Sequence, residues 1–240
     1  MEQRIIRADR QIIQSKIDKW KSLGKLAYVV KGLDGVANRW RVVLHNGVDI
    51  TYDTYKKGKG DKDVYPKCIG EVFNGFVACK QRLGNYKKIE DCNQGVNFGD
   101  FSRLHEKGLI KIDINRCYFN VAHILGFISD ELYKKYENKK FKKSCNIAIG
   151  KCATSTTITY YDENGNKTDY IIQKNELEPI RANILDYVAR LYDEVSKEVD
   201  IVIFNTDCFS IEKQDEATDK ENIEKIMRII DKHRLTYKLE

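Results

Sequence analysis

The stretch VDIVIFNTDCFSI, residues 199–211, constrains the fold of this chain more than any other. Apolar residues lead into Asn205, Thr206 and Asp207, and they return at alternate positions from Phe209 onward. Alternation on both sides of polar turn residues predicts two strands joined by a tight hairpin, with a carboxylate at its tip. Asp207 is then either a simple turn former, because Asp bonds its own backbone in turns, or a functional acid.

The other segments predict an α+β fold without internal repeats. The pairs Asn46-Gly47 and Asn164-Gly165 separate β-rich runs and are typical of hairpin turns. Segment 85–108 is polar and irregular, so we expect a surface connection there. Apolar spacing predicts helices near 5–24, 66–84, 118–137, 139–153, 175–198 and 219–234, and strands within 25–33, 39–55, 109–119, 156–173 and 235–240. Such an order favours an antiparallel sheet covered by helices.

Composition indicates a soluble globular protein with a modest basic excess. Of the 240 residues 42% are hydrophobic and 32% are charged, and the net charge is +6. The excess gathers in 54–67 and 133–143, which is compatible with a nucleic-acid partner, although lysine runs are more often solvated surfaces. No apolar run approaches the roughly 20 residues that span a bilayer. The N-terminal MEQRIIRADRQ has no signal core, so we expect no membrane partner and a cytoplasmic location.

The cysteines give no sign of a metal site. All seven are scattered, and neither they nor the four histidines show zinc spacing. We therefore expect free thiols in a reducing compartment.

A second acid, Asp113, lies in the strand that begins at Leu109. In an antiparallel sheet this strand can lie beside the hairpin of Asp207, which would place both carboxylates at one rim. Two close carboxylates repel each other unless a proton or a cation intervenes, and oxygen ligands beside a lysine-rich segment favour Mg²⁺. Such sites run phosphoryl and nucleotidyl transfer. The alternative is that Asp113 only stabilises the start of the following helix.

Three stretches, in order, resemble the motifs of the family B DNA polymerase palm domain. DINRCYFNV (113–121) is similar to motif A, an aspartate followed by Ser-Leu-Tyr-Pro-Ser. KKSCNIAIG (142–150) is similar to motif B, a lysine ahead of Asn-Ser-x-Tyr-Gly, and FNTDCFSI (204–211) to motif C, Tyr-x-Asp-Thr-Asp-Ser. The resemblance covers roughly residues 108–240, and it extends to minimal, phage-type members of the family, for which the host cytoplasm is the expected location.

The resemblance implies a metal site and a catalytic lysine. Asp113 and Asp207 would be the ligands of Mg²⁺ or Mn²⁺, helped by the backbone carbonyl of Ile114 and by the side chain of Asn205. Lys142 would grip the triphosphate and protonate the leaving pyrophosphate; alternatively, it is one more solvated charge.

The resemblance also implies contacts with a deoxynucleoside triphosphate. Tyr118 would lie under the sugar and exclude a 2′-hydroxyl, unless it is a plain core aromatic. Asn146 and Gly150 would shape the wall against the nascent base pair. Arg116 would either help to bind phosphate or form a surface ion pair.

This chain departs from the family pattern at several positions. Asn205 stands where motif C has its first aspartate, which removes one charge and should weaken metal binding. Arg116 and Phe119 replace the serine and the proline of motif A, and Ile147 and Ile149 replace the serine and the tyrosine of motif B.

The lengths predict a reduced architecture. Residues 1–107 would form an N-terminal α+β extension to which the sequence assigns no role, and 108–240 a palm-like catalytic region, the whole being one compact unit. The fingers would be very short, because 28 residues separate Asp113 from Lys142, and the thumb would be missing. We expect a nucleotidyltransferase that adds deoxynucleotides to a primer hydroxyl, working with DNA or another nucleic acid and with a partner subunit that supplies the thumb or the primer.

Two alternatives from other classes stay open. The first is a degenerate palm that acts as a nucleic-acid-binding or assembly subunit without chemistry. The second is a basic α+β binding module unrelated to polymerases, which would follow if Asp113 and Asp207 lay far apart in space.

Overall fold

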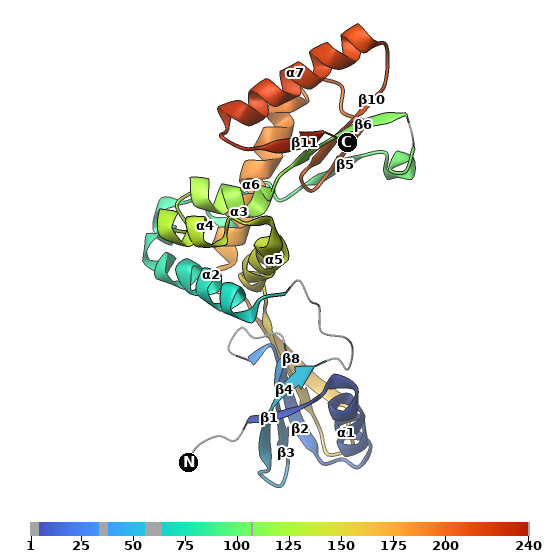
Figure 1. Ribbon diagram of the computed structural model, residues 1–240. Helices are drawn as coiled ribbons and strands as arrows, with labels where there is room; N and C mark the ends of the chain where they lie inside the picture. The colour runs from blue at the N-terminus through green and yellow to red at the C-terminus, as the bar shows by residue number, and fades with distance from the viewer. Residues whose placement is uncertain (1–4, 34–37, 56–63, 107, 240) are drawn as a thin grey trace. The chain divides into compact units, whose positions relative to one another are not determined.

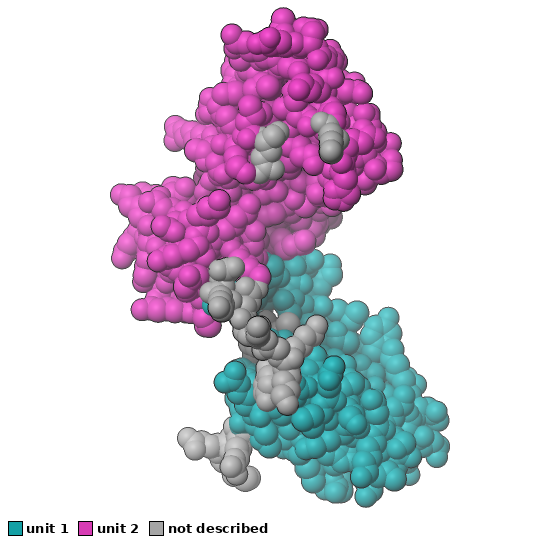
Figure 2. Space-filling model, turned by 45° about the vertical axis from the view of Figure 1, so that its right-hand side comes forward, with its two compact units in different colours: residues 1–64, 150–178 teal, residues 65–149, 179–240 magenta. Residues whose placement is uncertain are grey.

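The computed structural model describes residues 5–33, 38–55, 64–106 and 108–239, and it confirms an α+β fold (Figure 1). The chain forms two compact units (Figure 2). The first contains residues 1–64 and 150–178, and the second contains 65–149 and 179–240. These units do not follow the expected division at residue 107, because the hairpin at 156–173 pairs with a strand from the N-terminal region.

The first unit contains a six-stranded sheet in the order β1-β4-β3-β2-β7-β8. Neighbouring strands are antiparallel except for β1 and β4. The elements are β1 (Ile5–Asp9), α1 (Arg10–Ser22), β2 (Leu26–Lys31), β3 (Arg39–Leu44), β4 (Asp49–Tyr55), β7 (Thr156–Tyr161) and β8 (Lys167–Gln173). Both expected hairpin turns are confirmed, and each has its glycine, Gly47 or Gly165, at positive φ.

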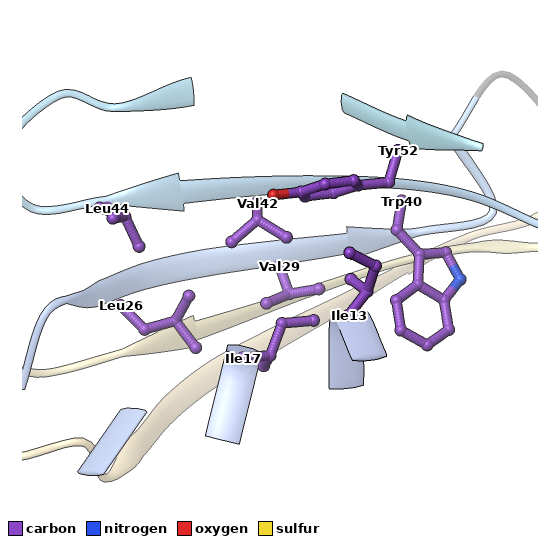
Figure 3. Close-up of a cluster of buried hydrophobic side chains, with 8 residues drawn as sticks. All are labelled: Ile13, Ile17, Leu26, Val29, Trp40, Val42, Leu44 and Tyr52. Atoms are coloured by element: carbon purple, nitrogen blue, oxygen red, sulfur yellow. The ribbon is translucent and has the colours of Figure 1, made fainter. Parts of the chain in front are cut away.

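Helix α1 covers one face of this sheet. Ile13 and Ile17 are buried there in a cluster shown in Figure 3. Their partners come from three strands: Leu26, Val29, Trp40, Val42, Leu44 and Tyr52. The expectation that the helix reaches back to Ile5 is wrong. Residues 5–9 pair with β4 as a strand, and the Asp9 carboxylate caps the helix by accepting the Gln11 backbone N–H.

The second unit contains an antiparallel sheet in the order β11-β6-β10-β9-β5. Its strands are β5 (Asn97–Gly99), β6 (Leu109–Ile114), β9 (Ile203–Asn205), β10 (Cys208–Glu212) and β11 (Tyr237–Leu239). Its longer helices are α2 (Pro66–Ala78), α3 (Cys117–Ile124), α4 (Asp130–Tyr136), α5 (Lys142–Lys151), α6 (Glu178–Val195) and α7 (Glu216–Lys232). Short 3₁₀ turns are η2 (Lys80–Asn85), η3 (Ile89–Asp91), η4 (Phe101–Arg103) and η5 (Lys139–Phe141).

Helix α6 packs against one face of the second sheet. Its Tyr192 ring lies 5.1 Å from Phe204 of β9 and 4.4 Å from Phe98 of β5. Ile112 and Phe209, paired across β6 and β10, are fully buried. The segment 85–108 is therefore more than a surface connection, because its three-residue strand β5 completes the sheet. Among the described residues, no helix is both long enough and apolar enough to cross a membrane.

Candidate functional site

A polar row crosses the second sheet from strand to strand. Lys238 of β11 pairs with Asp113 of β6, Asp113 pairs with Cys208 of β10, and Cys208 pairs with Asn205 of β9. Directly paired residues project from the same face of a sheet. Asp113 and Ile112 are neighbours on one strand, so this face is opposite to the one that carries the buried Ile112. The sheet therefore brings Asp113 and Asn205, which are far apart in sequence, into one row.

The turn between β9 and β10 places Asp207 beside the strand of Asp113. The backbone N–H of Ile114 donates to the Asp207 carbonyl at 2.8 Å, which fixes the hairpin tip against the end of β6. The Thr206 hydroxyl lies 2.9 Å from Asp207 Oδ1 and 2.7 Å from the Asn205 carbonyl, so it restrains the Asp207 side chain. The expected hairpin with a carboxylate at its tip is confirmed.

The turn is strained at Thr206. This residue has φ 58°, and the Asp207 N–H reaches back to the Asn205 carbonyl at 2.7 Å across it. Positive φ is unusual for a β-branched residue, and such strain gathers at functional sites. Arg116, immediately before α3, is also left-handed, at φ 49°. Strained backbone thus flanks Asp113 and Asp207 from two different segments.

Lys142, the first residue of α5, approaches the same place. Its Nζ lies 4.0 Å from Asp207 Oδ2, and the two side chains are 40% and 16% exposed. Since the ammonium is substantially solvated, the ion pair contributes little to stability. The position of Lys142 matters more, because its ammonium lies beside the Asp207 carboxylate and can still contact an anionic ligand.

Asp113 and Lys142 line one cleft of about 480 Å³ in the second unit. The charged residues at its wall are four cations and two acids: Arg116, Lys139, Lys142, Lys238, Asp113 and Glu137. An excess of cations in a concave site favours anionic ligands such as phosphates. The basic segment 133–143 thus contributes to the cleft, whereas most of 54–67 lies outside the described residues.

Arg116 is not a surface residue. Arg116 is only 8% exposed. Its guanidinium donates to the Asn138 carbonyl at 2.7 Å and to Cys145 Sγ at 3.4 Å. Nε is buried without a hydrogen-bond partner. Within the described parts of the chain, no carboxylate pairs with this guanidinium, so the surface ion pair considered from the sequence is wrong.

Tyr118 lies on α3 beneath the hairpin. Its hydroxyl is 3.4 Å from the Thr206 carbonyl, and burial raises its pKa well above the usual range, so the phenol stays neutral at physiological pH. The neighbouring Cys117 is fully buried, and after burial itself the charges of Asp207 and Asp113 also raise its thiol pKa. The negative charges of Asp113 and Asp207 therefore both reach the Cys117 thiol at the start of α3.

Among the described residues that line the cleft, Asn146, Ile114 and Gly150 do not appear. Asn146, one helical turn after Lys142, has a buried Oδ1 without a partner. Ile114 is buried and contacts Asp207 through its N–H. Gly150 lies near the end of α5, where the division between the two units falls. A Cβ added there would meet nothing within 4 Å, so no close packing requires glycine.

Sequence reasoning missed several residues of the cleft. Lys139, Lys238 and the Asn120–Tyr133 pair, joined by a 3.0 Å hydrogen bond, all contribute to its wall. Only the register of β11 against β6 places Lys238 opposite Asp113. The basic run at 133–143 was the single signal that could have indicated Lys139.

The oxygen donors fit a Mg²⁺ ion that is shared with a phosphate ligand. No three His, Cys, Asp or Glu residues gather into a metal-binding group within the described ranges. The described residues therefore hold no cage built from these four residue types, but Mg²⁺ usually binds through one or two carboxylates plus substrate phosphates and water. Asp113 and Asp207 supply that number of carboxylates.

Comparison with protein-family models, with curated proteins and with solved structures finds no match to this chain.

Proposed function

We propose that this chain is a minimal nucleotidyltransferase with a palm like that of family B DNA polymerases. One observation carries the proposal: three segments that are distant in sequence converge in one unit. Asp113 is followed by Ile114, the last residue of β6, whose N–H donates to the Asp207 carbonyl. Lys142 lies 4.0 Å from Asp207 and lines the same cleft as Asp113. These segments are the ones that resemble motifs A, C and B.

The substrate proposed is a deoxynucleoside triphosphate, together with a nucleic-acid primer. Mg²⁺ would be held by Asp113 and Asp207, with the Asn205 amide nearby, and when bound it would polarise the transferring phosphate and activate the primer hydroxyl. The Lys142 ammonium would bind the phosphates as a point charge and supply the proton to the leaving pyrophosphate. Tyr118, held against the hairpin, would form the floor under the sugar.

The test is a primer-extension assay with purified protein, Mg²⁺ or Mn²⁺ and labelled deoxynucleotides. Asp207→Ala should abolish incorporation, because it removes one of two carboxylate ligands. Asp200→Ala, at an exposed aspartate outside the cleft, is the matched control and should retain it. Equal incorporation by both variants, or none by the unmodified protein on any primer, would contradict the proposal.

One observation favours a second candidate. Asn205 gives the row a neutral amide where a further carboxylate would strengthen metal binding, and the described residues contain no larger ligand group. A catalytically silent palm that binds nucleic acid fits this donor set as well. It predicts that unmodified protein and Asp207→Ala bind a labelled oligonucleotide equally and that neither incorporates nucleotides.

A further inference from the structure

We infer that the cleft uses a single divalent cation and that the buried Arg116 guanidinium takes the place of a second one. The inference rests on the proposed function and specifies its cofactor: one metal ion, with a protein cation completing the phosphate site. It depends on two features of this chain, the donors around Asp113 and the environment of Arg116.

The donors are too few and too weakly charged for two hard cations. Two-metal sites hold their ions about 3.5–4 Å apart, where the repulsion must be offset by several anionic ligands. Here the row offers one carboxylate, the Cys208 thiol and the Asn205 amide, and the hairpin tip adds Asp207. Glu137 also lines the cleft, but among the described residues it does not complete a group of three acidic or soft ligands. A thiol is a poor ligand for Mg²⁺, and an amide brings no charge. Two carboxylates neutralise the charge of one divalent ion.

Arg116 supplies the complementary observation. It is an almost fully buried cation at the cleft wall whose partners, a carbonyl and a thiol, are both uncharged. A buried cation without a counter-charge is costly, and an anionic ligand in the cleft would offset that cost. Guanidinium also matches phosphate oxygens in a two-pronged geometry.

The position of Arg116 ties this cation to the rest of the site. It lies three residues after Asp113, and its bonds to Asn138 and Cys145 bracket the start of α5, where Lys142 lies. Relative to the motifs that the chain resembles, Asn205 removes one negative charge and Arg116 adds one positive charge. Together these two differences make the site more positive by two charges, which is the charge that a second divalent ion would bring.

The first experiment counts bound Mn²⁺ by electron paramagnetic resonance. The full chain is titrated with a non-hydrolysable deoxynucleoside triphosphate analogue, and the signal from the analogue alone is subtracted. One tightly bound Mn²⁺ per chain is expected, and Asp207→Ala should lose it. Two tightly bound ions would overturn the inference and leave the proposed function standing. No Mn²⁺ beyond that of the analogue would overturn both.

The second experiment uses reciprocal variants. Arg116→Ser combined with Asn205→Asp should raise the count from one ion to two, whereas Asn85→Asp, at an exposed asparagine, should leave it at one. Without metal, inorganic tripolyphosphate should bind Arg116→Ser at least about tenfold more weakly than the unmodified chain, the loss expected for one charge-assisted contact. An unchanged affinity would overturn the role of Arg116. Arg116→Lys keeps the charge, so its affinity for tripolyphosphate should lie between those of Arg116→Ser and the unmodified chain. The count of Mn²⁺ bound to the unmodified chain tests the inference even if a variant fails to fold.

Discussion

The strain at Thr206 can be measured by comparing Thr206→Gly with Thr206→Val. Both variants lose the hydroxyl that bonds Asn205 and Asp207, which is worth about 1 kcal/mol of stability. Valine keeps the β-branch at φ 58°, whereas glycine removes a left-handed penalty of about 1–2 kcal/mol. Glycine also costs about 0.5–1 kcal/mol in backbone entropy. The glycine variant should therefore be the more stable of the two, by about 0.5–1 kcal/mol.

The assay is urea unfolding followed by far-ultraviolet circular dichroism. Both tryptophans, Trp20 and Trp40, lie in the first unit, so their fluorescence would report on the wrong part of the chain. Activity should change in the opposite direction to stability: glycine frees the Asp207 backbone, so nucleotide incorporation should fall further in Thr206→Gly than in Thr206→Val.

A matched pair at Thr168 provides the control. This threonine is exposed in strand β8 and does not have positive φ, so valine should there be more stable than glycine. If Thr206 shows the same order as Thr168, with valine more stable than glycine, the turn is not strained and the reasoning is refuted.

Two further predictions concern Tyr118 and the α6 residue Asp186, whose carboxylate accepts from the Lys87 ammonium and from the Asn93 N–H. Burial raises the pKa of Asp186, but the Asn93 N–H and the Lys87 ammonium outweigh it, so the pKa lies below its usual value. The stabilisation of the folded chain by ionised Asp186 is complete above the unfolded pKa of about 3.9, and it is lost as the pH falls below that value through the lower folded pKa. Asp186→Asn should thus be less stable than the wild type at pH 7, with a gap that closes in acid. A gap that persists under acidic conditions would contradict this. Tyr118→Ala should admit ribonucleotides, whereas Tyr118→Phe should not, as judged by the ratio of ribonucleotide to deoxynucleotide incorporation. An unchanged ratio in Tyr118→Ala would refute the assigned role.

Local chemistry made several elements predictable from the sequence. The Asn-Gly turns favour positive φ at glycine, and both hairpins formed there. Ser129 is a typical N-cap residue, and its hydroxyl accepts the Leu132 N–H at the start of α4. The alternating strands around Asp207 paired as predicted. In each case the deciding interactions lie within a few residues along the chain.

Features decided by distant partners were not predictable. Strand β5 has three residues and exists because Phe98 pairs with Phe204 across more than a hundred positions. Ile5 has helical spacing to later apolar residues, yet pairing with β4 makes it part of a strand. The burial of Arg116 was not predictable, because nothing in the sequence shows that its guanidinium donates to the Asn138 carbonyl and to Cys145 Sγ.

The interleaving of the two units has a consequence for how the chain folds. Strand β2 pairs with β7, for example Val29 with Thr159. The chain between these two strands includes residues 65–149, which contain most of the helices of the second unit. In a growing polypeptide, the β2 edge that pairs with β7 stays unpaired until residues 65–149 have been synthesised. During that time Val29 and Val30, which are buried in the folded chain, are exposed and can promote self-association. Pairings between such distant residues also slow folding. Assembly of the N-terminal sheet is thus coupled to the synthesis of residues 65–149, and a lesion in that stretch can damage a sheet to which it contributes no strand.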